Sequence, residues 1–166
     1  MLKWNPAVVD GNSHDLSHLH PMTFPLAMAA KGDLPAQNFT INVAFGLHCF
    51  TAEKTPDTPA GLDYGDAREI RSFDLGRYEL SKLLPEIIQS LHQRRCYEAK
   101  LNNYMTVELV GTQGPVHYQV YFKVTKTGAP NTLMLFVQSA YAKNAPKQVQ
   151  RQKPCLFKAI CIKASL

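Results

Sequence analysis

The feature that most constrains this fold is a series of extended segments in the second half of the chain, separated by short turns. The third segment shows the pattern best, because Tyr118, Val120 and Phe122 alternate with mostly polar side chains. A period of two is typical of a strand that buries one face. Five such strands are predicted, at residues 96–99, 104–110, 116–126, 132–141 and 156–163. Turn residues connect most of them closely, and short connections favour an antiparallel meander.

Two segments nearer the N-terminus show the same strand pattern. Residues 37–45 alternate apolar side chains such as Ile41 and Val43 with polar ones, and residues 23–30 form an extended segment before them. The short connection at residues 31–36 predicts that the two pair as a β-hairpin.

One region carries the spacing of a helix. Apolar side chains between Leu75 and Leu91 recur every three or four residues, and Asp74 is suited to cap the first turn. Pro85 breaks this helix or begins a second one. The predicted fold class is therefore α+β: a twisted antiparallel sheet of about five or more strands, packed against one long or broken helix, with an N-terminal β-hairpin.

A chain of 166 residues is long enough for one domain, which we assign to residues 23–166. Residues 1–22 are polar and contain two prolines, so we expect an irregular N-terminal arm. Residues 53–66 are expected to form a long surface loop. No apolar run approaches the length of a membrane span, and no signal peptide is evident. We therefore expect a soluble, cytoplasmic protein that does not act at a membrane.

The four cysteines have no metal-binding or redox spacing, and we expect buried or free thiols rather than a disulfide framework. Cys49 in particular follows an apolar strand and is expected in the core. Its neighbour His48 ends that strand, where its imidazole could act as a general acid or base near neutral pH. A structural histidine is the alternative interpretation.

Positive charge is concentrated in the second half of the chain. Residues 1–93 hold 7 Lys and Arg against 11 Asp and Glu, whereas residues 94–166 hold 11 against 2. Such a basic segment suits a polyanionic partner such as RNA, because each neutralised phosphate releases counterions. It also suits an acidic partner protein, and an ordinary solvated surface is the third interpretation.

Two further groups of residues suggest specific chemistry. His14, His18 and His20 could together supply zinc ligands, although a polar arm with capping residues explains the same spacing. The second group places arginines and tyrosines around the ends of the predicted helix, where arginine can clamp a phosphate and tyrosine can stack on unpaired bases. Its arginines are Arg68, Arg71, Arg77, Arg94 and Arg95.

The strand at residues 132–141 ends in Ser139-Ala140-Tyr141, followed by a basic segment. With the preceding helix and meander, residues 74–143 resemble the RelE/barnase/EndoU/colicin-type ribonucleases. The resemblance implies a toxin-like endoribonuclease that needs no metal or cofactor and cleaves RNA by attack of the 2′-OH on the adjacent phosphate. An acidic inhibitor protein is then a further expected partner.

The same resemblance implies roles for five residues. His48 would be the base or acid, Arg77 and Arg95 would stabilise the phosphate, Ser139 would hydrogen-bond a phosphate oxygen, and Tyr141 would orient the substrate or share the proton transfer. Two other classes remain open: a non-catalytic module that binds nucleic acid or an acidic protein, and a structural or assembly protein of a phage or mobile element. Convergence of the predicted residues within about 10 Å in one cleft would favour the enzyme.

Overall fold

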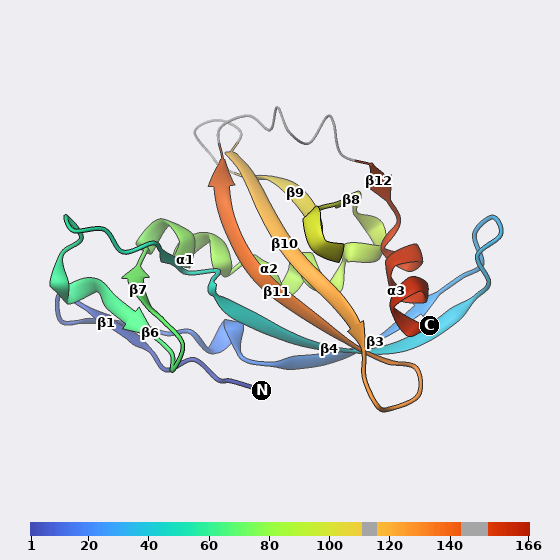
Figure 1. Ribbon diagram of the computed structural model, residues 1–166, viewed down its shortest axis with the longest axis horizontal. Coiled ribbons are helices and arrows are strands. Elements are labelled where there is room, and N and C mark those ends of the chain that lie inside the picture. Colours follow the sequence, from blue (N-terminus) through green and yellow to red (C-terminus); the bar gives the residue numbers. More distant parts are fainter. Residues whose placement is uncertain (111–115, 144–152) are drawn as a thin grey trace.

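The computed structural model describes residues 1–110, 116–143 and 153–166, and it has a mixed α+β fold built around a twisted seven-stranded sheet (Figure 1). The strand order in this sheet is β12-β8-β9-β10-β11-β4-β3. Its strands are β3 (Met22–Met28), β4 (Gln37–His48), β8 (Cys96–Glu98), β9 (Tyr104–Val110), β10 (Val116–Lys126), β11 (Thr132–Lys143) and β12 (Pro154–Cys155).

Strands β8 to β11 form the predicted antiparallel meander. The alternation of β10 is confirmed, because Tyr118, Val120, Phe122 and Val124 are all buried. Strand β11 then pairs on its other edge with β4, and this pairing is parallel. The expectation of an entirely antiparallel sheet is therefore wrong at this one pair. The long connection between β4 and β11 lets the chain return in the same direction, which a tight turn could not do.

The predicted N-terminal hairpin is present as β3 and β4, which pair antiparallel from Met22 with Val43 to Met28 with Gln37. Alternate residues of β4, including Ile41 and Val43, are fully buried. The hairpin thus extends the meander on the β11 side, instead of standing apart from it.

The helical region is broken into two short helices, α1 (Leu75–Ser81) and α2 (Leu84–Gln89). Asp74 caps α1, because its side-chain oxygen accepts a 2.9 Å hydrogen bond from the Arg77 backbone N–H. Pro85 lies in the first turn of α2, where its missing N–H costs no helical hydrogen bond. A 3₁₀ turn, η3 (Leu91–Gln93), follows, and η4 (Lys100–Asn102) lies between β8 and β9.

The predicted last strand at residues 156–163 is wrong, because this segment forms helix α3 (Phe157–Ser165). The two residues of β12 and Leu156, just before the helix, are extended. The buried residues Phe157, Ile160 and Cys161 have the i, i+3, i+4 spacing of a helix face, and the isoleucines gave a misleading strand signal. The ring of Phe157 packs against Phe122 of β10 with centroids 6.1 Å apart.

A second, three-stranded sheet lies at the opposite end of the molecule from α3 (Figure 1). It contains β5 (Thr51–Ala52), β7 (Ile70–Phe73) and β6 (Asp63–Gly65), in that order. The predicted loop at residues 53–66 follows β5 within this sheet. It contains a short 3₁₀ turn, η2 (Ala60–Leu62), and strand β6. Within the described ranges, no helix has the length and apolar character needed to cross a membrane.

Residues 1–22 belong to the packed body of the protein. They form β1 (Ala7–Val9), β2 (Asn12–His14) and the 3₁₀ turn η1 (Ser17–Leu19). Leu16 and Leu19 are fully buried, and the Trp4 indole N–H donates a 3.0 Å hydrogen bond to the Phe45 carbonyl. The segment that the sequence suggested as an irregular arm thus contributes to the core.

Candidate functional site

The candidate site lies where the C-terminal ends of the parallel strands β4 and β11 meet. His48, the last residue of β4, is in register with Ser139 of β11, beside a bulge in that strand. A Cβ atom at Gly46 would come within 2.9 Å of the Gln138 carbonyl oxygen, so glycine permits the two backbones to approach here. A pocket of about 410 Å³ opens at this point, and it is lined by Gly46, Leu47, His48, Arg68, Glu69, Phe136, Gln138 and Ser139.

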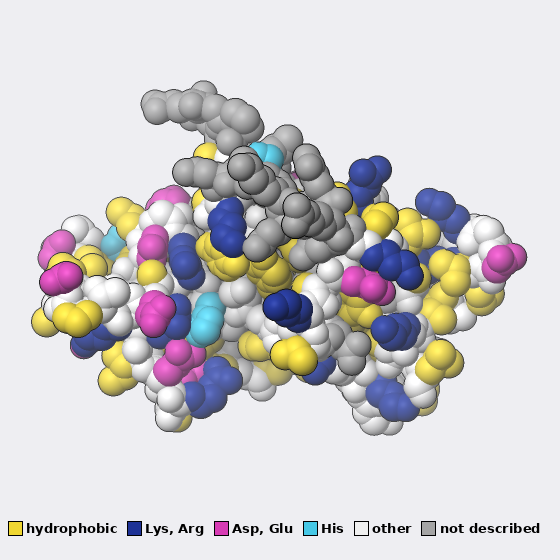
Figure 2. Space-filling view, turned by 45° about the horizontal axis from the view of Figure 1, so that its top comes forward, with side chains coloured by type: hydrophobic (Ala, Val, Ile, Leu, Met, Phe, Trp, Pro, Cys, Tyr) yellow, Lys and Arg dark blue, Asp and Glu magenta, His cyan; other side chains and the backbone are white. Residues whose placement is uncertain are grey.

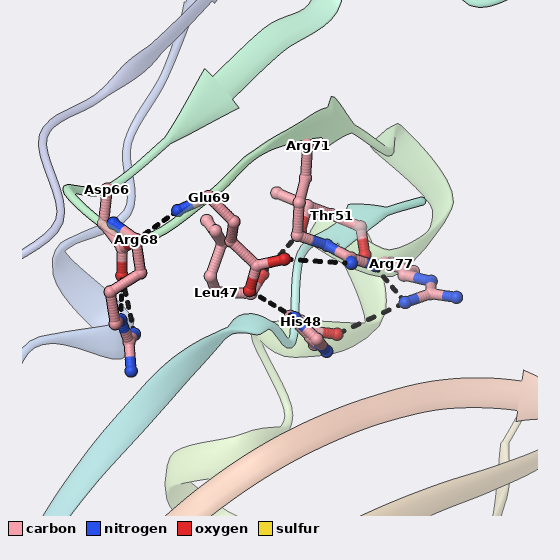
Figure 3. A network of polar contacts seen from close by, with 8 residues as sticks. All are labelled: Leu47, His48, Thr51, Asp66, Arg68, Glu69, Arg71 and Arg77. Atoms are coloured by element: carbon pink, nitrogen blue, oxygen red, sulfur yellow. Dashed lines mark hydrogen bonds and ion pairs between the residues drawn. The ribbon is translucent and has the colours of Figure 1, made fainter. Parts of the chain in front are cut away.

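A network of polar contacts holds His48 at the pocket (Figure 3). Its Nε2 atom is 2.7 Å from Glu69 Oε1. The second carboxylate oxygen of Glu69 accepts a 3.4 Å hydrogen bond from Arg71, whose Nε donates to Thr51 Oγ1 at 3.0 Å. The side chains of His48 and Glu69 are each 40% exposed, whereas that of Arg71 is 13% exposed. The network therefore joins a mostly buried arginine to a solvent-accessible carboxylate–imidazole pair.

The electrostatics of this pair favour an ionised carboxylate. The hydrogen bond from His48 lowers the pKa of Glu69 below its usual range, and the Arg71 guanidinium lowers it further. A carboxylate only accepts hydrogen bonds, so the imidazole nitrogen that faces it carries the proton. In a neutral imidazole that donates from Nε2, the other ring nitrogen, Nδ1, has a lone pair that can accept a proton.

Arg77 joins this network to the end of β11. Its Nη1 donates to the Thr51 carbonyl at 2.7 Å and to the His48 carbonyl at 3.4 Å. Its guanidinium carbon lies 5.3 Å from the centre of the Tyr141 ring, within the range of a cation–π contact. Tyr141 also stacks on Tyr121 of β10, with centroids 5.7 Å apart.

A second pocket, of about 510 Å³, lies beside Arg77 and shares no lining residue with the first. Arg77 and Tyr141 both line it, together with apolar residues of α1, β10 and β11. The structure therefore brings together four of the five predicted site residues: His48, Arg77, Ser139 and Tyr141. His48 and Ser139 line one pocket and Arg77 and Tyr141 line the other, and Arg77 reaches His48 through the His48 backbone carbonyl, so convergence in one cleft stays a prediction.

Arg95 is not part of this site. It immediately precedes β8, which is separated from β11 by two other strands of the sheet, and it lines a different pocket with Arg94 and Lys31. Its position beside Arg94 at the end of the helical region made it look like a partner of Arg77. The meander places Arg95 far from the site at β11, because each intervening strand adds about 5 Å across the sheet.

Sequence reasoning did not identify Glu69, and it treated Arg71 only as one of several helix-flanking cations. The available signal was an acid between two arginines, Arg68 and Arg71, on the segment that leads into a capped helix. What the sequence could not supply was the pairing of β7 with β5, which brings this segment beside Thr51 and His48.

The three N-terminal histidines do not converge. The His14 ring packs against Phe73 and Tyr78, with centroids 5.1 and 5.2 Å away. His18 Nε2 is 2.8 Å from Ser81 Oγ, and His20 Nε2 is 2.9 Å from the Trp4 carbonyl. Among the described residues, no group of three or more His, Cys, Asp or Glu is arranged to hold a metal ion.

Among the basic residues that the structure describes, no single groove leads to His48. Acidic side chains gather toward the end of the molecule that carries β6 and β7, whereas lysines and arginines extend across the whole face shown in Figure 2. Lys123, Lys126 and Lys163 line one pocket, and Lys31, Arg94 and Arg95 line another. Lys147 and Arg151, which contribute to the charge of the C-terminal segment, lie outside the described residues.

Fold and site together define a mixed α+β protein with an imidazole–carboxylate pair and two arginines at the ends of two parallel strands of the large sheet. The chain belongs to the YjaZ family, whose model matches residues 6–165. No curated protein and no solved structure matches it.

Proposed function

We propose that this protein is a metal-independent endoribonuclease whose active site is the cluster around His48. The single observation that carries the proposal is the network in which the His48–Glu69 pair is bound by Arg71 and the His48 backbone carbonyl by Arg77, beside Ser139. Cleavage of RNA by its own 2′-OH needs a base, an acid and cations near the phosphate, and this cluster holds all three kinds of group.

In the proposed reaction, Glu69 holds the Nε2–H of His48, so that Nδ1 accepts the proton of the 2′-OH. The 2′-oxygen then forms a bond to phosphorus as the bond to the 5′-oxygen breaks. The Tyr141 hydroxyl gives the leaving oxygen its proton, and the proton taken up by His48 then returns through solvent to the Tyr141 oxygen. The products are a 2′,3′-cyclic phosphate and a 5′-hydroxyl end.

The remaining groups act on the phosphate and on the bases. Arg77 stabilises the developing negative charge, with Ser139 as a hydrogen-bond donor to a phosphate oxygen. The stacked rings of Tyr121 and Tyr141 offer an aromatic surface for an unpaired base. RNA is then the substrate. The proposal also includes an acidic inhibitor protein as a binding partner and the cytoplasm as the location.

The test is digestion of a short single-stranded RNA in buffer that contains EDTA. Wild-type protein should leave 2′,3′-cyclic phosphate ends, and replacement of the cleavage-site nucleotide by its 2′-deoxy form should stop the reaction. His48→Asn should lower the rate by about 10²-fold or more, the usual contribution of a general base. Arg77→Lys keeps the charge but loses the planar fork, so it should also lower the rate.

The matched control is His117→Asn, which changes a histidine of β10 that lines neither pocket of the site. Its cleavage rate should equal that of wild type. Intact RNA in the wild-type reaction, or cleavage that EDTA abolishes, would overturn the proposal. Retention of RNA on a filter without cleavage would instead identify a non-catalytic RNA-binding module.

A further inference from the structure

A separate pocket of about 560 Å³ lies on the other side of the meander from His48, around β8 and β12. Three parts of the chain that are distant in sequence form it: the β3–β4 connection, the segment from η3 into β8, and the segment from β12 into α3. Its lining consists of Lys31, His92, Gln93, Arg94, Arg95, Pro154, Cys155 and Leu156. No acidic residue is among these lining residues.

Two walls of the pocket are held in place by cationic side chains, one of them buried and the other in an ion pair. Lys158 of α3 is 7% exposed, and its ammonium group donates hydrogen bonds to the carbonyls of Ala29 and Leu34 on either side of Lys31. Arg94 is bound to the Glu108 carboxylate and, at 2.9 Å, to Ser90 Oγ. These contacts hold the β3–β4 connection against α3, and the start of β8 against β9.

The cations that remain available to a ligand are exposed. Lys31 and Arg95 are both solvent-accessible on the pocket rim, and His92 is exposed beside them. An arginine offers a fork of N–H donors that fits a phosphate, and a lysine adds a compact charge. Lysines and arginines also predominate over acids on the α3 half of the face shown in Figure 2.

We propose that this pocket binds a phosphate monoester group, held by Arg95 and Lys31 with His92 beside them. The ligand is a small phosphorylated molecule or the phosphorylated end of an RNA, which share this chemistry. The site is independent of the cluster around His48, because the two pockets share no residue.

The chain carries its own reporter for occupancy of the pocket. Cys155 lines it and is partly exposed, whereas the other three cysteines, Cys49, Cys96 and Cys161, are fully buried. Burial raises the pKa of Cys155 to about 11, so its alkylation is slow at neutral pH and becomes faster as the pH rises. A phosphate group bound between Arg95 and Lys31 should shield this thiol.

The experiment titrates pyrophosphate into the full chain by calorimetry and measures Cys155 alkylation by intact mass at mildly alkaline pH. Pyrophosphate should bind saturably and slow the alkylation. Arg95→Gln and Lys31→Gln should each weaken binding about tenfold, the size expected for one charged hydrogen bond, and remove the protection. Lys123→Gln removes an exposed charge elsewhere on the sheet and should change neither result.

Further titrations separate the two ligand sources. Tighter binding of a nucleoside monophosphate than of its nucleoside identifies a small phosphorylated ligand, and tighter binding of a 5′-phosphorylated RNA than of its 5′-hydroxyl form identifies an RNA end. Absence of saturable pyrophosphate binding, or equal binding by wild type and Arg95→Gln, would overturn the proposal. His48→Asn should bind pyrophosphate as wild type does, so failure of the ribonuclease proposal leaves this one intact.

Discussion

The two carboxylate oxygens of Glu69 bind different partners in the network around His48. One faces the imidazole of His48 and the other accepts from Arg71. Removing this carboxylate would free the imidazole to rotate and would leave the mostly buried Arg71 without its carboxylate partner. At the residue scale, the geometry of the site therefore depends on one ionised acid.

The stability of the protein should depend on pH through this residue. The pKa of Glu69 is lowered in the folded state, first by the hydrogen bond from His48. Its stabilising contribution is therefore complete above the ordinary Glu pKa and is lost as the pH falls through the lowered folded-state value. Urea unfolding at a series of acidic pH values should show a smaller loss of stability for Glu69→Gln than for wild type.

The control for this measurement is Glu53→Gln, which changes an exposed glutamate that has no ion pair among the described contacts. Its pH dependence should follow that of wild type. Parallel curves for Glu69→Gln and wild type would show that the pair with His48 does not contribute to stability in acid.

At the scale of single elements, helix α3 closes one end of the core. Phe157 is 2% exposed and contacts Phe122, whereas its neighbour Leu156 is 43% exposed. Adjacent residues of similar apolar character thus have very different surroundings, because Phe157 begins the buried face of the helix whereas Leu156 is the extended residue just before it.

These two positions provide a matched pair of truncations. Phe157→Ala should lower the free energy of unfolding by about 3 kcal/mol or more, since it removes a buried aromatic ring and leaves a cavity. Leu156→Ala should cost less than about 1 kcal/mol, because most surface changes are small. Chemical denaturation measures both values, and equal effects would contradict the packing of α3 described above.

Local sequence patterns predicted most strands and the broken helix, because side-chain alternation and capping residues act over a few positions. Asp74 and Pro85 marked helix starts correctly. The isoleucines of α3 favour strands in short windows, and only packing on β10 makes their segment a helix. The parallel pairing of β4 with β11 and the contact of Glu69 with His48 depend on distant parts of the chain, so local patterns could not reveal them.

At the scale of the whole molecule, the N-terminal segment and the body form one packed unit. Trp4 is 5% exposed, and its ring contacts Phe50 at a centroid distance of 5.3 Å. The same region is tied to β4 by the indole hydrogen bond to Phe45. Residues 1–22 should therefore unfold together with the sheet, not ahead of it.

Trp4 is the single tryptophan of the chain, so its fluorescence reports this behaviour directly. The native emission should be blue-shifted, and its urea transition should coincide with the loss of sheet measured by far-ultraviolet circular dichroism. A fluorescence transition at clearly lower urea would mean that the N-terminal segment detaches first. The Trp4→Phe variant supplies the blank for the tryptophan fluorescence. Its unfolding curve by circular dichroism should retain a single transition.

The parallel pair of β4 and β11, which lies next to the edge strand β3 of the large sheet, also has a consequence for synthesis on the ribosome. Thr40 of β4 pairs with Thr132 of β11. After β4 is synthesised, about 90 more residues must be added before β11 exists to pair with the free edge of the hairpin. Joining segments so far apart closes a large loop, which slows folding. Throughout that interval a nascent chain exposes an unsatisfied row of backbone donors and acceptors, the kind of edge that invites aggregation and chaperone capture.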